Sequence, residues 1–521
     1  GYGEQTRFAL RALQSRPDLF DIYLLNLEWG KSNHIIDDNE EHQWLIETIQ
    51  KTAHYINSGQ PQFDVSLQVT IPNEFERMAP INIGYTAGIE TTKVAPQWLQ
   101  KCNELMDKII VVSNHSKDVF INTMVEAQDQ HGNKFPYKLE KPVEVVNYPI
   151  RPQTPKDVEL DLPHDFNYLV VSQWGPRKNF ENTIKWFVEE NFDQEVGLVV
   201  KTNSHKNCTI DRHFTQNRLN ALLAPYKDRK CSVTLLHGYM DEAEMQGLYR
   251  HEKIKAFINI AHGEGYGLPL FDAAIAGLPI ITIGWSGQCD FLFVPEKDKK
   301  GKFLKVEFDI LPVHESAVWN GVIQADSMWA YAKEGSYKMA LRKMRNEHHV
   351  YLGMAKSLKK WIEQEFTEEK KYLEFSQEVF GEKLFSYDSV DVSEIPKISF
   401  VTSVYKGGDF IEGFMEDITN QTIFEDKCEL ILVNCNSPDD EEEKVKQWQE
   451  KFPENIKYIK LDDDPGIYAA WNLAIKESTG EFISNANLDD RKSPQFAEKL
   501  GKFLYAHPDV DCVYTNNLMT K

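Results

Sequence analysis

The sequence predicts an α/β protein in which short parallel strands alternate with helices in consecutive units along the chain. The 521 residues exceed the length of one ordinary domain. Short apolar stretches recur between segments of helical periodicity, which is the pattern of parallel sheets covered on both faces. A composition of 41% hydrophobic residues, including 29 Phe, indicates packed cores rather than disorder.

The predicted units are 1–150, 151–385 and 396–521, with a polar linker at 386–395. In the first unit we expect helices at 6–13 and 98–106, strands at 22–27 and 108–112, and a turn at 1–4 that follows a strand outside this sequence. Prolines and acids at 149–163 interrupt the periodicity and predict a hinge.

The second and third units repeat the α/β rhythm. In the second unit we expect strands at 168–171, 197–201, 233–236, 256–260 and 280–283, followed by helices at 337–345 and 351–365. In the third we expect strands at 398–404 and 429–433 and a helix at 471–477. The acid runs 439–443 and 462–464 are expected in loops or on solvated faces.

A glycine-rich turn within 262–281 is the most informative segment of the chain. Gly265 and Gly267 let backbone amides approach a ligand closely, because they lack a Cβ atom. Pro269 suits the first turn of a helix and Gly277 suits the residue past its end, which predicts a helix of roughly two turns. The free N–H groups at this helix start favour a diphosphate. A plain helix–strand turn is the alternative.

This turn resembles the signature of retaining family 4 glycosyltransferases, in which two acids enclose a Gly-Phe/Tyr-Gly-Leu-Pro sequence. The resemblance implies a GT-B architecture, with two facing Rossmann-like domains, 1–150 on the acceptor side and 151–385 on the nucleotide-sugar side. It implies that Glu264 orients the sugar and that Asp272 binds the ribose, since a carboxylate can accept bonds from vicinal hydroxyls. Asp272 replaces the family's usual Glu and is one methylene shorter, which weakens that contact or routes it through water. Donor contacts are also implied for Gly265, Tyr266, Gly267 and Leu268.

Arg177 and Lys178 follow the strand predicted at 168–171, at the edge where open α/β sheets bind ligands. Fixed cations there stabilise a leaving diphosphate as its charge grows, whereas the alternative is a surface basic pair at a helix start. The resemblance implies that this pair holds the donor phosphates. The predicted catalytic residues are therefore Glu264, Arg177 and Lys178.

Further loops resemble the donor loops of the same family. Gly3 lies in a stretch similar to its N-terminal glycine loop, and Glu90 lies in a similar donor-side loop at 83–92. Gly238 and Tyr239 resemble the turn that meets the nucleotide base, although an ordinary glycine turn fits equally well. Tyr85 stands near the place where many members have a histidine, so no catalytic histidine is assigned.

The third unit resembles the front half of an inverting family 2 glycosyltransferase, which implies a partial GT-A fold. The implied nucleotide contacts are Val404, Tyr405, Asn434, Asp464 and Asn472. Asp489 and Asp490 stand where the family has its Asp-x-Asp metal motif, which implies Mg²⁺ or Mn²⁺; a helix-capping pair is the alternative. Asn434 and Asn487 replace acids of the family pattern, and the sequence ends before the family's acceptor half, so this unit is expected to be catalytically incomplete.

Charge and cysteine content limit the partners. A net charge of −22 and a pI near 5.2 disfavour nucleic acid. The 7 cysteines show no Cys-x-x-Cys pair, which favours a reducing, cytoplasmic setting. No apolar run approaches the length of a membrane span.

Together the resemblances imply transfer of a hexosyl unit from a UDP-, GDP- or dTDP-hexose to a growing or lipid-linked glycan, as in polysaccharide, capsule or lipopolysaccharide assembly. The first module is expected to act with retention and without a cofactor, in the cytoplasm and in peripheral association with the inner face of the membrane. Two alternatives remain: a sugar-nucleotide epimerase of GT-B build, and a third domain that is a non-catalytic nucleotide- or glycan-binding scaffold.

Overall fold

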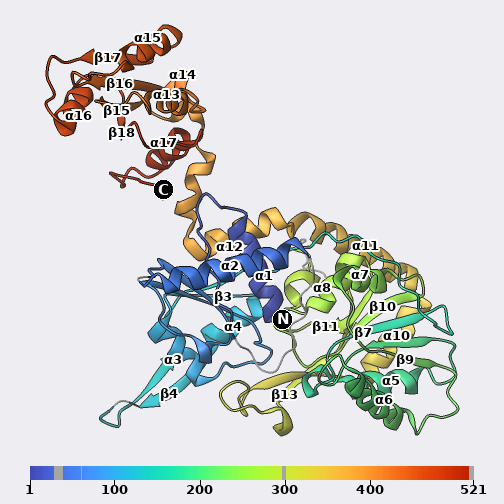
Figure 1. Ribbon diagram of the computed structural model, residues 1–521. Coiled ribbons are helices and arrows are strands. Elements are labelled where there is room, and N and C mark those ends of the chain that lie inside the picture. The colour runs from blue at the N-terminus through green and yellow to red at the C-terminus, as the bar shows by residue number, and fades with distance from the viewer. Residues whose placement is uncertain (28–38, 60, 129, 296–300, 516–521) are drawn as a thin grey trace. The chain divides into compact units, whose positions relative to one another are not determined.

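The chain divides into two compact units, Gly1–Val379 and Phe380–Lys521, and each is built on parallel sheets with helices around them (Figure 1). The computed structural model describes residues 1–27, 39–59, 61–128, 130–295 and 301–515. These sheets confirm the predicted α/β fold class. In the described part of the chain, no helix combines the length and apolar character needed to cross a bilayer.

The first sheet of unit 1 contains four parallel strands in the order β1-β2-β3-β6. Its strands are β1 (Val65–Val69), β2 (Ile81–Thr86), β3 (Lys108–Val111) and β6 (Val143–Val145). The helices of this half are α1 (Tyr2–Gln14), α2 (Glu40–Asn57), η1 (Pro72–Glu74), α3 (Pro96–Leu105) and α4 (Asn114–Asn122), and a hairpin is formed by β4 (Met124–Gln128) and β5 (Lys134–Lys138).

Two predictions for this half are wrong. Residues 22–27 are not a strand, because Leu24 N donates to Thr52 Oγ1 of α2 and the Tyr23 ring packs against Tyr55, so the segment bonds to a helix instead of a sheet. Residues 1–4 are not a turn, because α1 begins at Tyr2 and Gly1 O accepts the first helical bonds from Glu4 N and Gln5 N.

The second sheet of unit 1 has six parallel strands in the order β12-β11-β10-β7-β8-β9. The chain order along the sheet reverses between β7 and β10, which is the topological switch point of a Rossmann-like fold. The strands are β7 (Asn167–Val171), β8 (Gly197–Lys201), β9 (Ser232–Leu236), β10 (Ile254–Asn259), β11 (Ile280–Ile283) and β12 (Leu304–Val306). The helices of this half are η2 (Pro176–Lys178), α5 (Phe180–Glu190), α6 (Thr209–Leu223), α7 (Glu242–Arg250), α8 (Leu268–Ala276) and α9 (Cys289–Leu292).

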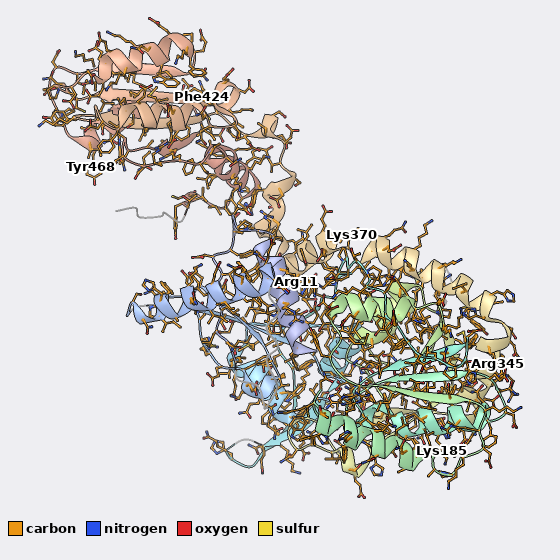
Figure 2. The ribbon with its side chains drawn as sticks, turned by 45° about the vertical axis from the view of Figure 1, so that its right-hand side comes forward. Arg11, Lys185, Arg345, Lys370, Phe424 and Tyr468 are labelled. Carbon is orange, nitrogen blue, oxygen red and sulfur yellow. The ribbon has the colours of Figure 1, made fainter. Side chains whose placement is uncertain are left out.

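A hairpin and three helices complete unit 1. The hairpin is β13 (Phe308–Pro312) and β14 (Met328–Ala332), with η3 (Glu315–Ala317) in its loop. The helices are α10 (Glu334–Asn346), α11 (His348–Glu365) and α12 (Glu368–Phe380). Arg345 of α10, labelled in Figure 2, donates to Asn191 Oδ1 at 3.0 Å beside the end of α5. Phe375 of α12 packs against Phe8 of α1 at 5.3 Å between ring centroids, so the last helix returns to the first half.

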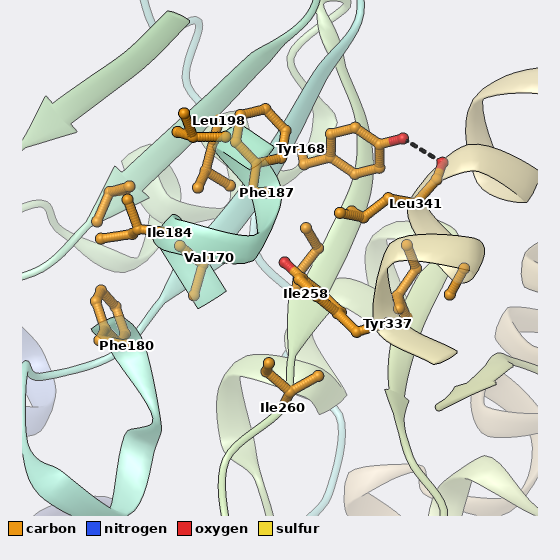
Figure 3. Packing of buried hydrophobic residues seen from close by; sticks show 14 of the residues in the cluster. Tyr168, Val170, Phe180, Ile184, Phe187, Leu198, Ile258, Ile260, Tyr337 and Leu341 are labelled. Atoms are coloured by element: carbon orange, nitrogen blue, oxygen red, sulfur yellow. Dashed lines mark hydrogen bonds between the residues drawn. The ribbon is translucent and has the colours of Figure 1, made fainter. Parts of the chain in front are cut away.

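The core of the second sheet lies between β7, α5 and α10 (Figure 3). Tyr168 and Ile258 belong to its strands, Phe187 to α5 and Tyr337 to α10, and all four are buried. The Tyr168 hydroxyl donates to Leu341 O at 2.7 Å, which satisfies the one polar atom of that ring. Burial of such large side chains contributes roughly 1.5–3 kcal/mol each, so this core fixes the strand ends that carry the site.

Unit 2 has a four-stranded parallel sheet in the order β17-β16-β15-β18, which reverses between β15 and β18. The strands are β15 (Ile398–Val404), β16 (Cys428–Asn434), β17 (Ile456–Lys460) and β18 (Phe482–Asn485). The helices are η4 (Glu382–Ser389), η5 (Val392–Glu394), α13 (Ile411–Thr419), α14 (Phe424–Lys427), α15 (Glu441–Lys451), α16 (Ile467–Lys476) and α17 (Phe496–Ala506).

Two segments of unit 2 differ from their predictions, the linker at 386–395 and the acid run at 439–443. The stretch predicted as a linker contains 3-10 helices, and its Tyr387 packs against Phe503 of α17 at 5.8 Å between ring centroids. In the acid run 439–443, Glu441 is fully buried, which corrects the expected solvated face. Its carboxylate accepts bonds from Gly407 N at 2.6 Å and Ser437 Oγ at 2.9 Å, so it holds two loops together.

Candidate functional site

The predicted catalytic residues of unit 1 meet at the switch point of the second sheet. Arg177 and Lys178 lie in η2, directly after β7, and Glu264 lies in the loop between β10 and α8. Because β7 and β10 are adjacent parallel strands, their carboxyl ends open on the same edge. His262 N donates to Arg177 O at 2.8 Å, which fixes the two loops against each other.

Glu264 is the centre of an ion cluster. Lys178 Nζ lies 2.6 Å from Glu264 Oε1 and 2.8 Å from Oε2, and Arg177 Nη1 lies 3.2 Å from Oε2. Asn259 Nδ2 donates to Oε1 at 3.0 Å, and the Glu264 amide donates to Ser286 Oγ at 2.9 Å. Both carboxylate oxygens are therefore occupied. No sequence motif singled out Asn259, the last residue of β10, or Ser286, which lies in the loop after β11.

The electrostatics of the cluster follow from its burial. Glu264 is 5% exposed, and burial alone would raise the pKa of its carboxyl group. The charges of Lys178 and Arg177 outweigh that cost and hold the pKa of Glu264 at about 2. Burial lowers the pKa of the Lys178 ammonium, and the neighbouring Arg177 lowers it further.

Loops of the first half close on this cluster. Glu90, which follows β2, places Oε1 3.3 Å from Arg177 Nη2. Ser113 Oγ donates to Gly265 O at 2.7 Å, and a Cβ on Gly265 would lie 3.2 Å from Gly88 N. A glycine at 265 thus permits close approach of the two halves as well as of a ligand.

Helix α8 begins and ends as the sequence predicts. Gly267 precedes it with φ +90°, Leu268 is its first residue, and Gly277 ends it with φ +77°. Tyr266 lies in the core, however, at 3% exposure, with its ring 5.0 Å from Tyr148 and 5.1 Å from Phe291 between centroids. The structure therefore makes Tyr266 a packing residue at the joint of the two halves.

Asp272 lies in the second turn of α8, away from the helix start. Burial raises its pKa to about 7, and the negative charges of Glu4 and Glu242 add to the effect. Arg151 partly offsets them, and its Nη1 lies 2.5 Å from Glu242 Oε1 and 3.5 Å from Glu4 Oε2. Gly3 belongs to the first turn of α1.

The predicted base-binding turn follows β9, the edge strand of the same sheet. Gly238 has φ +118°, and its carbonyl accepts a bond from Lys201 Nζ. Tyr239 is 51% exposed. Since β8 and β7 separate β9 from β10, this turn lies along the same sheet edge as Glu264 but does not belong to the ion cluster.

In unit 2 the carboxyl ends of β15, β16 and β18 bring most predicted residues to one sheet edge. Val404 ends β15 and is buried, Tyr405 follows at 45% exposure, and Asn434 ends β16. Asn434 Nδ2 donates to Tyr458 OH at 2.7 Å, and its Oδ1 accepts from Ser437 N at 2.8 Å. The nucleotide contact assigned to Asn434 would therefore compete with existing bonds.

The remaining residues of unit 2 lie in loops and on α16. Asp489 and Asp490 are exposed in the loop after β18, and Asp490 Oδ2 accepts from Asn487 Nδ2 at 3.0 Å. Neither acid caps α17, whose preceding residue is Gln495. Asp464 accepts from Gly466 N at 2.9 Å ahead of α16, and Asn472 is exposed on that helix. Among the residues that the structure describes, no cluster of three or more His, Cys, Asp or Glu side chains is placed to hold a metal.

In unit 2 the strand order reverses between β15 and β18, and acids lie in the loop after β18. Residues 399–519 match the model of glycosyl transferase family 2. The C-terminal part of the chain is thus similar to the family 2 glycosyl transferases.

Parts of the chain are similar to parts of known proteins. The minor teichoic acid biosynthesis protein GgaB of Bacillus subtilis (strain 168) is 32% identical over 134 residues, which are 26% of this chain and 14% of that protein. Glycosyltransferase AglE of Haloferax volcanii is 27% identical over 107 residues, or 20% of this chain and 35% of that protein. The chain therefore spans only a minor part of these relatives. Sucrose-phosphate synthase of Thermosynechococcus elongatus superimposes with a TM-score of 0.44 and 15% identity over 66% of this chain and 78% of that one.

Proposed function

We propose that Gly1–Val379 transfers a hexosyl unit from a nucleotide sugar to a growing glycan, with retention at the anomeric carbon. The observation that carries the proposal is the pair Arg177 and Lys178, fixed by Glu264 at the switch point of the second sheet. This edge is where open α/β sheets bind nucleotides. The start of α8, with its free N–H groups, follows Glu264 in the same loop and suits the diphosphate.

The chemistry assigns a role to each group. As the bond between the anomeric carbon and the diphosphate breaks, negative charge grows on the leaving oxygen, and Lys178 and Arg177 stabilise it. Glu264 has both oxygens engaged, so it positions the two cations and does not attack the anomeric carbon. The acceptor hydroxyl then attacks from the face that the diphosphate leaves, and a phosphate oxygen takes its proton.

For the family 2 domain we propose nucleotide-sugar binding at the edge formed by Tyr405, Asn434 and the Asp489 loop. The exposed carboxylates of Asp489 and Asp490 are hard oxygen donors that suit Mg²⁺ or Mn²⁺, which would neutralise the donor diphosphate. The two modules would act in one glycan pathway in the cytoplasm, at the inner membrane face. The relative named for teichoic acid biosynthesis supports a cell-surface polymer as the acceptor.

The test is nucleotide release from UDP-, GDP- and dTDP-hexoses by the full chain, with and without a pool of malto-, cello- and chito-oligosaccharides. Acceptor-stimulated release that falls about 100-fold or more in Lys178→Ala supports the proposal. The matched control is Lys185→Ala, because Lys185 lies on the outer side of α5 with half of its side chain exposed (Figure 2).

Three results would contradict the proposal. Unchanged turnover in Lys178→Ala would remove the phosphate role of the cation pair. Turnover of the donor to its epimer without an acceptor would indicate the epimerase. An inverted product anomer, formed while the family 2 domain carries Asp489→Asn, would exclude retention by Gly1–Val379.

A further inference from the structure

The loop of the β13–β14 hairpin presents an exposed tryptophan near the cation pair. Trp319 is 61% exposed and lies two residues after η3. The η3 helix packs against η2, which contains Arg177 and Lys178. The base of the hairpin is also tied to the site, because His262 stacks on Trp329 at 5.3 Å between ring centroids and accepts a bond from Ala330 N.

The backbone of Trp319 is held rigidly. Trp319 and Ile323 exchange two bonds, of 3.1 Å from Trp319 N and 2.7 Å from Ile323 N. At the tip between them, Gly321 has φ +77°, and its carbonyl accepts from Trp98 Nε1 at 3.0 Å and Asn73 Nδ2 at 3.2 Å. Trp98 and Asn73 belong to the first half of unit 1, so the loop spans both halves and little backbone entropy remains to be lost on binding.

The loop lies on the Glu90 side of Arg177. Met328 N donates to Thr92 Oγ1 at 3.0 Å, and Lys93 Nζ lies 2.5 Å from Asp326 Oδ2. Thr92 is two residues from Glu90, which pairs with Arg177. Asn73, Trp98, Thr92 and Lys93, which this loop contacts, all belong to 1–150, the half that the resemblance assigns to the acceptor, so the loop borders the acceptor half of unit 1.

We propose that Trp319 is the stacking surface for the pyranose ring of the acceptor glycan. The inference rests on the proposed function and extends it to acceptor binding. An exposed indole face attracts the C–H face of a sugar, whose hydroxyl groups stay in water. Glu315, four residues before Trp319, is exposed and can accept bonds from those hydroxyls, and the overall charge of −22 disfavours an anionic lipid surface as the occupant.

The experiment compares Trp319→Ala and Trp319→Phe with the wild-type chain, using the oligosaccharide pool and the donor found active with it. We expect Trp319→Ala to raise the half-saturating pool concentration about tenfold, while Trp319→Phe restores most of the affinity because it keeps an aromatic face. Nucleotide release without acceptor stays at the wild-type rate. Met339→Ala is the control, because Met339 is also exposed but lies on α10.

Two results would overturn the inference while leaving the proposed function intact. The first is an unchanged half-saturating concentration in Trp319→Ala. The second is loss of sedimentation with phosphatidylglycerol vesicles in that variant at normal acceptor affinity, which would make Trp319 a membrane contact. A wild-type chain that shows no acceptor-stimulated release would instead refute the proposed function, and this inference with it.

Discussion

Replacing Asp272 by Asn should stabilise unit 1, and the gain should grow with pH. The unfolded chain releases the Asp272 proton near pH 3.8, whereas the folded chain holds it until about pH 7, because burial and the charges of Glu4 and Glu242 disfavour the carboxylate. The free energy of unfolding therefore falls as pH rises through that window. Asparagine carries no charge at any of these pH values, so the variant escapes the loss.

The magnitude follows from the two pKa values. Each pH unit between 3.8 and about 7 lowers the free energy of unfolding of the wild-type chain by about 1.4 kcal/mol. The loss is therefore about 2 kcal/mol at pH 5.5 and reaches its full value of about 4 kcal/mol at pH 8. Asp272→Asn should exceed the wild-type chain in stability by these amounts. Because Asn keeps the shape of Asp, packing in α8 should change little.

The assay is urea unfolding of the full chain at pH 5.5 and at pH 8. Hydrogen exchange in peptides that cover α8 reports the unfolding of unit 1. The control is Asp165→Asn, whose side chain is 96% exposed and which should change stability by less than about 0.5 kcal/mol. A gain that is equal at both pH values, or a loss of stability at pH 8, would refute the reasoning.

Three further predictions use the same chain. Glu264→Gln should lower the stability of unit 1 at neutral pH by about 3 kcal/mol in urea unfolding, since Lys178 loses its charged partner in a buried site; wild-type stability would contradict the ion-cluster argument. Gly287→Ala should cost about 1–3 kcal/mol, because the new Cβ would lie 2.0 Å from Gly265 O, whereas Gly335→Ala, with open space around it, should cost nothing in the same thermal unfolding assay. Asp489→Asn should weaken Mn²⁺-dependent binding of UDP, GDP or dTDP at least about tenfold by titration calorimetry, and chelation of the metal should produce the same loss in the wild-type chain.

The sequence predicted the strands and helices that have strong local signals. Gly267 and Gly277 define α8 by their positive φ angles, which few other residues adopt, and the short apolar runs of β7 and β15 bury on both faces. The strand prediction for 22–27 was wrong because the same apolar pattern suits a strand in a sheet and an extended segment that packs along a helix. Local periodicity does not reveal which partner a segment meets.

The sequence by itself determined the α/β class, the glycine turn before α8 and the placement of Arg177, Lys178 and Glu264 at strand ends. Only the tertiary structure decided which of these residues contact one another, because contacts between residues far apart in the sequence depend on strand order. Strand order put β7 beside β10, which joined Lys178 to Glu264, and long-range packing made Tyr266 a core residue and left Trp319 exposed. Burial raises the pKa of both Glu264 and Asp272, and the neighbouring charges, which no local pattern specifies, made the two shifts opposite: cations lie beside Glu264, whereas acids lie near Asp272.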